Sequence, residues 1–256
     1  MDFLSSLHHH TILLLLLLLT ACRADSGTWE RIQQDCRLRV GLDPTYPPFE
    51  IGDENGLRGL DVDLAEAIAQ EMGVEAEFVW IGYDGLYDSL RTGQVDVLLS
   101  ALVIMPSQMD DFSYSTPYFD AGERLIVRGD SGIAGLDGVK TLAVELGAQG
   151  HVEALALQKQ SPALLVQPYS TADEALAAVL DRRADGGIVD GINGRLFLQT
   201  HPALRILPDP ITVEPFAAVV RRGDQVLLRE LSGAMEVLGE NGRLDQILAD
   251  WLDESR

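Results

Sequence analysis

The segment GLDPTYPPFE, residues 41–50, carries the residue types in this sequence that best suit ligand binding. A β-type run over residues 38–42 stops there, and the three prolines that follow fix φ and remove backbone donors. Tyr46 and Phe49 are therefore held in a stiff loop just beyond the carboxyl end of a strand, where open α/β sheets bind ligands. The alternative is that the prolines only make a turn and that the rings only cover the core.

The sequence contains few residues suited to catalysis or to metal binding. The sequence has no CxxC, HExxH, GxSxG or Walker-type motif, and three of its five histidines lie at residues 8–10. Because only His151 and His201 remain, a histidine-rich metal site is excluded and a Ser-His-Asp triad has few candidates. We expect neither a metal nor a cofactor.

The chain is strongly acidic, with 40 Asp and Glu against 19 Lys and Arg and a net charge of −21. Such a surface repels nucleic acid and anionic lipid headgroups, so we expect neither as a partner.

The N-terminal residues predict export. Residues 11–20, TILLLLLLLT, are too short an apolar run to span a bilayer comfortably but have the length of a signal-peptide core. The run ends in Leu-Thr-Ala-Cys, which resembles the lipobox of bacterial lipoproteins, with cleavage before Cys22 and lipid on its thiol. We expect a signal peptide over residues 1–21, a polar tether over residues 22–36 and an extracytoplasmic, lipid-anchored protein of the bacterial cell envelope. An uncleaved membrane anchor is the alternative.

The elements that must position the site alternate between strand and helix, which predicts an α/β fold with mainly parallel sheets. The expected elements are strands at 38–42, 77–81, 95–100, 140–145 and 186–190, and helices at 60–73, 83–93, from about 151, at 171–183, 224–238 and 244–252. Ser170 or Thr171 is expected to cap the helix at 171–183.

Two further extended stretches, residues 123–129 and 214–223, bracket the second block of elements. A block bracketed by two crossing strands indicates an inserted lobe. We therefore expect one lobe from residues 37–122 and 214–256, and a second lobe from residues 123–213 with the hinge strands.

These segments carry a family resemblance. Six stretches carry it, in order, over nearly all of residues 37–253. They are LRVGLDPTYPPFE, GLRGLDVDLAEAIAQEMGV, GYDGLYDSLRTGQVDVLLSAL, FSYSTPYFDAG, TLAVELGAQG and PFAAVVRRGD. They resemble family 3 of the bacterial extracellular solute-binding proteins, the polar amino-acid class that serves ABC importers. The resemblance implies the two-lobe type II periplasmic-binding-protein fold, with two crossing strands and a ligand enclosed in the cleft by hinge closure.

The resemblance also implies the ligand contacts. Carried over by position, they are Asp43, Tyr46, Tyr83, Ser100, Ala101, Leu102, Val103 and Gln108 in the first lobe, and Ala148, Gln149 and Asp190 in the second. Tyr46 and Tyr83 can sandwich a ligand, and aromatic faces attract cations. Asp190 matches the acid that pairs with the ligand's α-ammonium, and Asp43 an acid that contacts a side-chain ammonium. A helix-capping or surface role is the alternative for both acids.

The family's grip on the ligand's α-carboxylate is altered in this sequence. The arginine that forms it in amino-acid binders is replaced by Gln108, which lacks the bidentate fork. A hydroxyl is missing at Val103, and the family's Thr-Thr turn reads Ala148-Gln149. These departures predict a cationic or amine-bearing ligand whose affinity depends little on an α-carboxylate.

We expect a monomeric solute-binding protein that delivers its ligand to the membrane subunits of an ABC importer. One alternative is an enzyme on the same scaffold, similar to cyclohexadienyl dehydratases, with Glu145 or Asp190 as proton donor. The other is a sensor or accessory domain that no longer serves transport.

Overall fold

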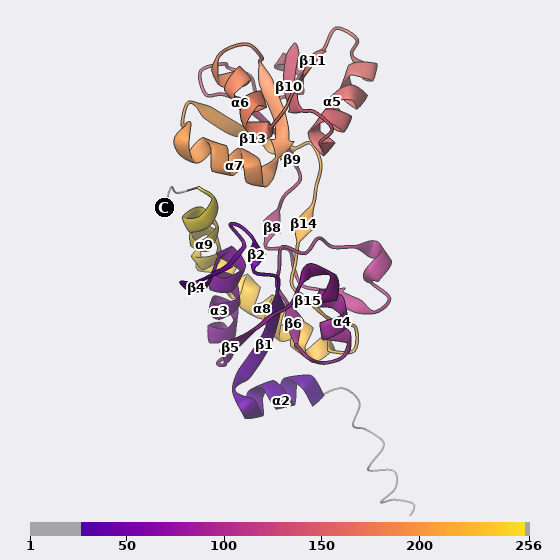
Figure 1. Ribbon diagram of the computed structural model, residues 1–256, viewed down its shortest axis with the longest axis vertical. Helices are drawn as coiled ribbons and strands as arrows, with labels where there is room; N and C mark the ends of the chain where they lie inside the picture. Colours follow the sequence, from indigo (N-terminus) through magenta and orange to yellow (C-terminus); the bar gives the residue numbers. More distant parts are fainter. Residues whose placement is uncertain (1–26, 254–256) are drawn as a thin grey trace, which may run out of the picture.

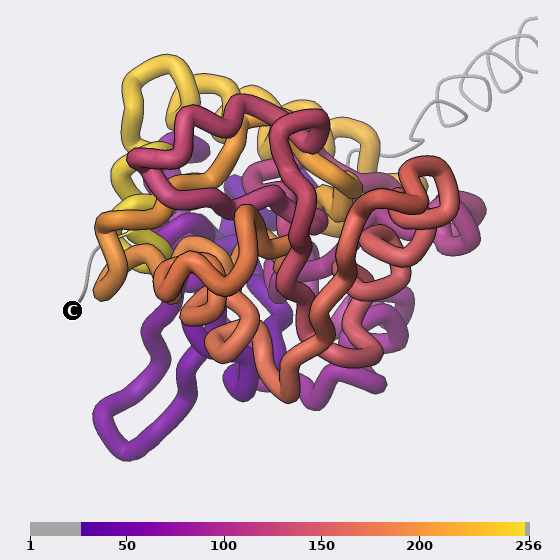
Figure 2. The backbone as a smooth tube through the Cα atoms, turned by 90° about the horizontal axis from the view of Figure 1, so that it is seen from above, coloured from indigo at the N-terminus to yellow at the C-terminus, as the bar shows by residue number. Residues whose placement is uncertain are grey.

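The computed structural model describes residues 27–253. These residues form two α/β lobes, one above the other, that are joined by two extended segments (Figure 1). Seen from above in Figure 2, the yellow C-terminal helices run along one side of the molecule. The two-lobe type II fold that the sequence predicts is therefore confirmed.

The first lobe is built on a sheet in the order β5-β1-β6-β15-β7. Its strands are β1 (Arg37–Leu42), β5 (Glu75–Trp80), β6 (Val97–Leu98), β7 (Phe112–Tyr114) and β15 (Val219–Arg221), with a small sheet of β2 (Thr45–Tyr46), β3 (Glu50–Asp53) and β4 (Gly56–Arg58). Its helices are α2 (Gly27–Asp35), α3 (Leu60–Glu71), α4 (Leu86–Arg91), α8 (Gln225–Glu240) and α9 (Arg243–Leu252), with 3-10 turns at Tyr83–Gly85 and Pro106–Gln108.

The second lobe is built on a sheet in the order β11-β10-β12-β9-β13. Its strands are β9 (Glu123–Arg128), β10 (Thr141–Glu145), β11 (Leu165–Tyr169), β12 (Gly186–Asp190) and β13 (Leu204–Pro210). Its helices are α5 (Gln149–Gln160), α6 (Ala172–Leu180) and α7 (Gly191–Thr200), with a 3-10 turn at Leu136–Gly138. The expected cap of α6 is Thr171, whose hydroxyl accepts a hydrogen bond from the backbone N–H of Glu174 at 3.1 Å.

The strand that enters each lobe after a crossing runs antiparallel to its neighbours. β9 pairs antiparallel with β12, so that Glu123 lies opposite Asp190, and β15 pairs antiparallel with β6, so that Val219 lies opposite Leu98. An antiparallel strand begins where its parallel neighbour ends. The crossing segments therefore enter both sheets at the carboxyl ends of the parallel strands, and the cleft lies between those ends.

The first crossing strand lies earlier than the sequence predicts. Residues 123–128 belong wholly to the sheet of the second lobe. The crossing pair is β8 (Phe119–Asp120) and β14 (Pro215–Phe216), which are antiparallel and lie between the lobes in Figure 1. The hydrophobic pattern of residues 123–128 predicts a strand correctly, but a pattern of this kind does not tell a hinge strand from a buried sheet strand.

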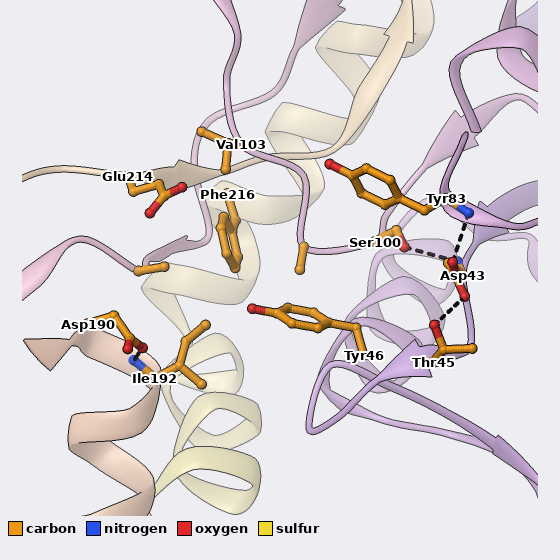
Figure 3. A pocket seen from close by; sticks show the side chains of 12 residues that line it. Asp43, Thr45, Tyr46, Tyr83, Ser100, Val103, Asp190, Ile192, Glu214 and Phe216 are labelled. Atoms are coloured by element: carbon orange, nitrogen blue, oxygen red, sulfur yellow. Dashed lines mark hydrogen bonds between the residues drawn. The ribbon is translucent and has the colours of Figure 1, made fainter. Parts of the chain in front are cut away.

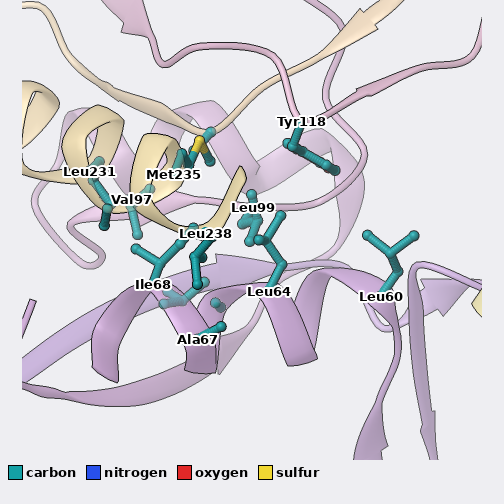
Figure 4. Packing of buried hydrophobic residues seen from close by; sticks show 14 of the residues in the cluster. Leu60, Leu64, Ala67, Ile68, Val97, Leu99, Tyr118, Leu231, Met235 and Leu238 are labelled. Atoms are coloured by element: carbon teal, nitrogen blue, oxygen red, sulfur yellow. The ribbon is translucent and has the colours of Figure 1, made fainter. Parts of the chain in front are cut away.

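Helix α3 packs against α8 and provides much of the core of the first lobe (Figure 4). Leu64 and Ile68 of α3 are buried against Leu231 and Leu238 of α8. Because α8 follows the return crossing, this contact joins the C-terminal part of the chain to the first lobe. The helix expected over residues 60–73 is confirmed, although α3 ends at Glu71.

Residues 27–35 do not form the expected polar tether. They form α2, whose Ile32 is fully buried in the core of the first lobe. Arg31 pairs with the buried carboxylate of Asp96, which Arg39 also contacts at 2.8 Å. The proposed signal peptide and Cys22 lie outside the described residues. Within residues 27–253, no helix is both long and apolar enough to cross a membrane.

Candidate functional site

A cavity of about 540 Å³ lies where the two lobes meet the crossing segments (Figure 3). Its lining residues come from the loops at the strand ends of both lobes and from the crossing segments. They are Asp43, Thr45, Tyr46, Tyr83, Ser100, Ala101, Val103, Ala121, Asp190, Ile192, Glu214 and Phe216.

The two rings of the 41–50 loop have different roles. Tyr46 is 48% exposed and lines the cavity, whereas Phe49 is fully buried. The rings stack with centroids 5.7 Å apart, and Phe49 packs against Phe119 and Phe216 in turn. The loop therefore presents Tyr46 to the cavity and supports it with Phe49, which packs into the core. The ligand-binding interpretation of the loop suits Tyr46, and the core-covering interpretation suits Phe49.

Asp43 connects the loops that carry the two tyrosines. Its Oδ1 accepts a hydrogen bond from the Thr45 hydroxyl and its Oδ2 from the backbone N–H of Tyr83, both at 2.8 Å. Its own N–H donates to the Ser100 hydroxyl at 3.0 Å. Asp43 thus positions Tyr83 and, through its neighbour Thr45, Tyr46.

Asp190 caps helix α7. Its Oδ1 accepts from the backbone N–H groups of Ile192 at 3.1 Å and Asn193 at 2.9 Å, and its Oδ2 accepts from the Asn193 side-chain amide at 2.7 Å. The capping role that the sequence left open is therefore present. An ionised carboxylate has about four acceptor positions, so roughly one remains for another donor.

Four residues carried over from the family do not line the cavity. Leu102 is 2% exposed, and its side chain packs into the core beside α4, because it points opposite to Ala101 and Val103. Gln108 lies on the 3-10 turn that begins at Pro106, outside the lining set. Gln149 is exposed at the start of α5, where its amide donates to Glu153 at 2.6 Å. Ala148, the N-cap of α5, is not part of the lining either.

The sequence interpretation missed Thr45, Ala121, Ile192, Glu214 and Phe216, all of which line the cavity. Glu214 and Phe216 lie at the start of the second bracketing stretch, residues 214–223. A segment that crosses between two lobes must pass the cleft between them. The topology of the two bracketing stretches is therefore the sequence signal that points to Glu214 and Phe216.

A buried acidic pair lies behind the cavity wall. Ala101 has a φ of 46°, which residues other than glycine seldom adopt. Its N–H donates to Oδ2 of the fully buried Asp61 at 2.6 Å, and the Tyr118 hydroxyl donates to the same oxygen at 2.9 Å. Both carboxyl oxygens of the fully buried Glu50 lack a partner among the described residues. Burial and the Asp61 charge raise the pKa of Glu50 far above its ordinary range, so Glu50 is protonated at neutral pH.

The cavity carries negative charge, and among the described residues no Lys, Arg or His lines it. Burial raises the pKa of Tyr46, and the charges of Asp190 and Glu214 raise it further. Burial also raises the pKa of Glu123, at the start of β9, to about 7, with the Asp190 charge as the next cause. Within the described chain, no group of three or more His, Cys, Asp or Glu is placed to hold a metal ion.

Comparisons with known proteins agree with this architecture. Residues 38–254 match the family model of the bacterial extracellular solute-binding proteins, family 3. The chain is 27% identical to the ABC transporter arginine-binding protein 1 of Escherichia coli K12, over 85% of this chain and 91% of that protein. It is also 27% identical to the L-cystine-binding protein TcyJ of the same strain, over 89% of this chain and 87% of that protein.

Among solved structures, an ancestral cationic amino-acid solute-binding protein is 30% identical, with a TM-score of 0.64 over 89% of this chain and all of that one. The family match spans both lobes and both crossing segments. The chain therefore belongs to family 3 of the bacterial extracellular solute-binding proteins.

Proposed function

We propose that this protein captures a small cationic or amine-bearing solute by hinge closure and delivers it to an ABC importer. Family membership already makes it an extracytoplasmic solute-binding protein whose relatives serve amino-acid importers. The proposal adds the charge of the ligand and the means of its capture. We further propose that the protein acts as a monomer.

One observation carries the proposed ligand charge. The cavity is lined by the carboxylates of Asp43, Asp190 and Glu214, and its lining, all within the described chain, includes no Lys, Arg or His. Burying a ligand carboxylate there without a charged partner is costly. A cation placed between these carboxylates and the rings of Tyr46 and Tyr83 meets favourable electrostatic partners.

The distribution of the lining supports closure. Tyr46 and Tyr83 belong to the first lobe, Asp190 and Ile192 belong to the second, and Phe216 belongs to a crossing segment. A ligand that contacts both lobes stabilises the arrangement in which they are closest. Rotation about the paired segments β8 and β14 would bring them together.

A binding role is favoured over catalysis. The dehydratase alternative needs a proton donor beside the ligand, and Glu145 does not line the cavity. Three acceptor positions of Asp190 are already occupied by the cap of α7. The lining also lacks a basic group to hold a substrate carboxylate.

Calorimetry with a matched pair of ligands tests the proposal. L-arginine and agmatine differ only in the α-carboxylate, which agmatine lacks. Because the lining offers that carboxylate no basic partner, agmatine is expected to bind at least as tightly as L-arginine. If L-arginine binds more than about tenfold tighter, roughly 1.4 kcal/mol, the protein does hold the carboxylate and the proposed ligand class is wrong.

Small-angle scattering on the same samples tests the closure. Saturating agmatine should reduce the radius of gyration, because the two lobes approach each other around the ligand. L-glutamate at the same concentration is the control, since its net negative charge should keep it from binding. An unchanged radius with agmatine at saturation contradicts capture by closure.

We also propose a lipid anchor at Cys22, on the basis of the Leu-Thr-Ala-Cys sequence alone. The full chain expressed in a bacterial host is expected to sediment with the membrane fraction. Cys22→Ser removes the acceptor thiol and should release the protein or leave it unprocessed. Recovery of the unaltered protein in the soluble fraction, with an N-terminus other than Cys22, contradicts the anchor.

A further inference from the structure

We infer that Glu214 determines the affinity of the cavity for its ligand, by holding an ammonium group of the ligand between its own carboxylate and that of Asp190. The inference rests on the proposed function, because it presupposes a cationic ligand. It adds the residue responsible and the chemical form of the positive group at this end of the cavity. The family resemblance does not point to this residue.

Glu214 differs from the other two carboxylates of the cavity in having no protein partner. Both oxygens of Asp43 accept hydrogen bonds from the loops they brace, and both oxygens of Asp190 accept from the first turn of α7. Within residues 27–253, the hydrogen bonds of Glu214 are those of its main chain, and neither a donor nor a cation pairs with its exposed carboxylate. It is therefore the carboxylate of the cavity with its full acceptor capacity available.

The main chain of Glu214 is held in place even though its side chain has no partner. Its N–H donates to Oδ1 of Asp120 at 2.8 Å, and its carbonyl accepts from the N–H of Ala121 at 3.0 Å. Oδ2 of Asp120 pairs in turn with Arg124 at 2.6 Å. Glu214 is thus fixed to the other crossing segment, so its carboxylate is offered to the cavity from a braced backbone.

The surroundings of Glu214 favour a positive group. Figure 3 shows Glu214 and Asp190 at one side of the cavity and Asp43 at the other, with Tyr46 between them. Burial is the main cause of the raised pKa of Tyr46 and of Glu123, and the charges of Asp190 and Glu214 raise both further. Like charges at close range disfavour one another, and a cation between them removes that repulsion. An ammonium group is compact and can donate to both carboxylates at once.

The position of Glu214 on the crossing segment has a further consequence. Hinge motion rotates the lobes about the crossing segments, so a group on such a segment moves little relative to either lobe. Asp190 and Tyr46 lie on opposite lobes, so the distance between them changes with closure. Glu214 can therefore contact the ligand before closure and keep that contact afterwards.

Calorimetry with agmatine tests the role of Glu214. Glu214→Gln keeps the length of the side chain and removes its charge, and it should weaken agmatine binding about tenfold or more. Glu240→Gln makes the same change of net charge at an exposed position near the end of α8 and should leave the affinity within about twofold. Butylguanidine is agmatine without its ammonium group, and it should bind the unaltered protein about tenfold more weakly than agmatine.

The outcomes separate the two proposals. If agmatine binds and Glu214→Gln leaves its affinity unchanged, the inference fails while the proposed function stands. Equal affinities of butylguanidine and agmatine for the unaltered protein also overturn the inference, because the ammonium would then contribute nothing. If agmatine does not bind at millimolar concentration, the proposed function fails and the inference fails with it.

Discussion

Replacing Asp61 by alanine is expected to lower the free energy of unfolding by about 3 kcal/mol. Asp61 is fully buried, and its Oδ2 accepts from both the Ala101 N–H and the Tyr118 hydroxyl. Alanine removes the acceptor of both donors, the buried Tyr118 hydroxyl and the N–H of the half-buried Ala101. Each such loss costs about 1–3 kcal/mol.

The Asp61 variant should also affect the cavity. Ala101 keeps a φ of 46° while its N–H is bound to Asp61, and Ala101 lines the cavity beside Ser100. Strained backbone of this kind persists only when its surroundings hold it. Without the Asp61 acceptor, the Ser100–Ala101 segment is expected to relax, and agmatine affinity should fall together with stability.

Urea unfolding at pH 7 measures the effect of the Asp61 substitution. Glu66→Ala is the matched control, because Glu66 lies on the same helix with an exposed side chain, and it should change stability by no more than about 0.5 kcal/mol. Tyr118→Phe removes only one of the two donors and should cost less than Asp61→Ala. A loss below about 1 kcal/mol for Asp61→Ala would show that the buried donors find other partners.

The fold was predictable because local patterns and order along the chain agree. The apolar spacing over residues 60–73 predicts a helix with one buried face, and α3 buries that face against α8. Alternation of strands and helices predicts mainly parallel sheets, and both lobes do contain parallel pairs, β1 with β5 and β10 with β11. The sheets are mixed instead of mainly parallel, because β9 and β15 return from the crossings and pair antiparallel with their neighbours. The crossing strand was misplaced because residues 123–128 have the composition of a buried strand, and they form one within the second lobe.

The site was only partly predictable, since it depends on contacts between distant segments. The loop sequence does not say that Tyr46 faces the cavity and Phe49 the core, because a proline-rich loop lacks the alternation of a strand. Leu102 was carried over with its neighbours, but successive side chains of an extended segment point to opposite sides. Glu214 lies in the cavity because two segments about ninety residues apart pair at the crossing, as its bond to Asp120 shows.

Gln149 illustrates a different limit. It belongs to the second lobe, so its distance from the residues of the first lobe depends on the angle between the lobes. No local sequence pattern encodes that angle. The ligand contacts of Gln108 and Gln149 therefore stay predictions. The side chain of Leu102 lies in the core and does not reach the cavity.

The stability of the protein is expected to fall as the pH rises from 6 to 8, and Glu50→Gln should remove most of that fall. Burial and the Asp61 charge raise the pKa of Glu50 in the folded protein far above the value that it has in the unfolded chain. Between these two values the folded state binds one proton more than the unfolded state. Rising pH therefore favours unfolding, by up to about 1.4 kcal/mol per pH unit for one such group.

Other acids with shifted pKa values also bear on this pH window. Burial raises the pKa of Asp61 to about 6 and that of Glu123 to about 7, and each contributes in the same direction up to its own pKa. The lowered pKa of Asp96 acts in the opposite direction, but its stabilisation is lost only when the pH falls below the ordinary range of an aspartate. The fall between pH 7 and 8 is therefore assigned to Glu50.

Glutamine at position 50 has the shape of the protonated carboxyl group but cannot ionise. Its amide N–H can donate to Oδ1 of Asp61, which has no partner among the described residues. Urea unfolding at pH 6, 7 and 8 should show a flatter dependence for Glu50→Gln, so that the variant gains stability over the unaltered protein as the pH rises. Glu240→Gln, at an exposed position, should run parallel to the unaltered protein. If the stability of Glu50→Gln also runs parallel to that of the unaltered protein from pH 6 to 8, Glu50 is ionised in the folded state. Glu50 and Asp61 would then need a cation that balances their two charges.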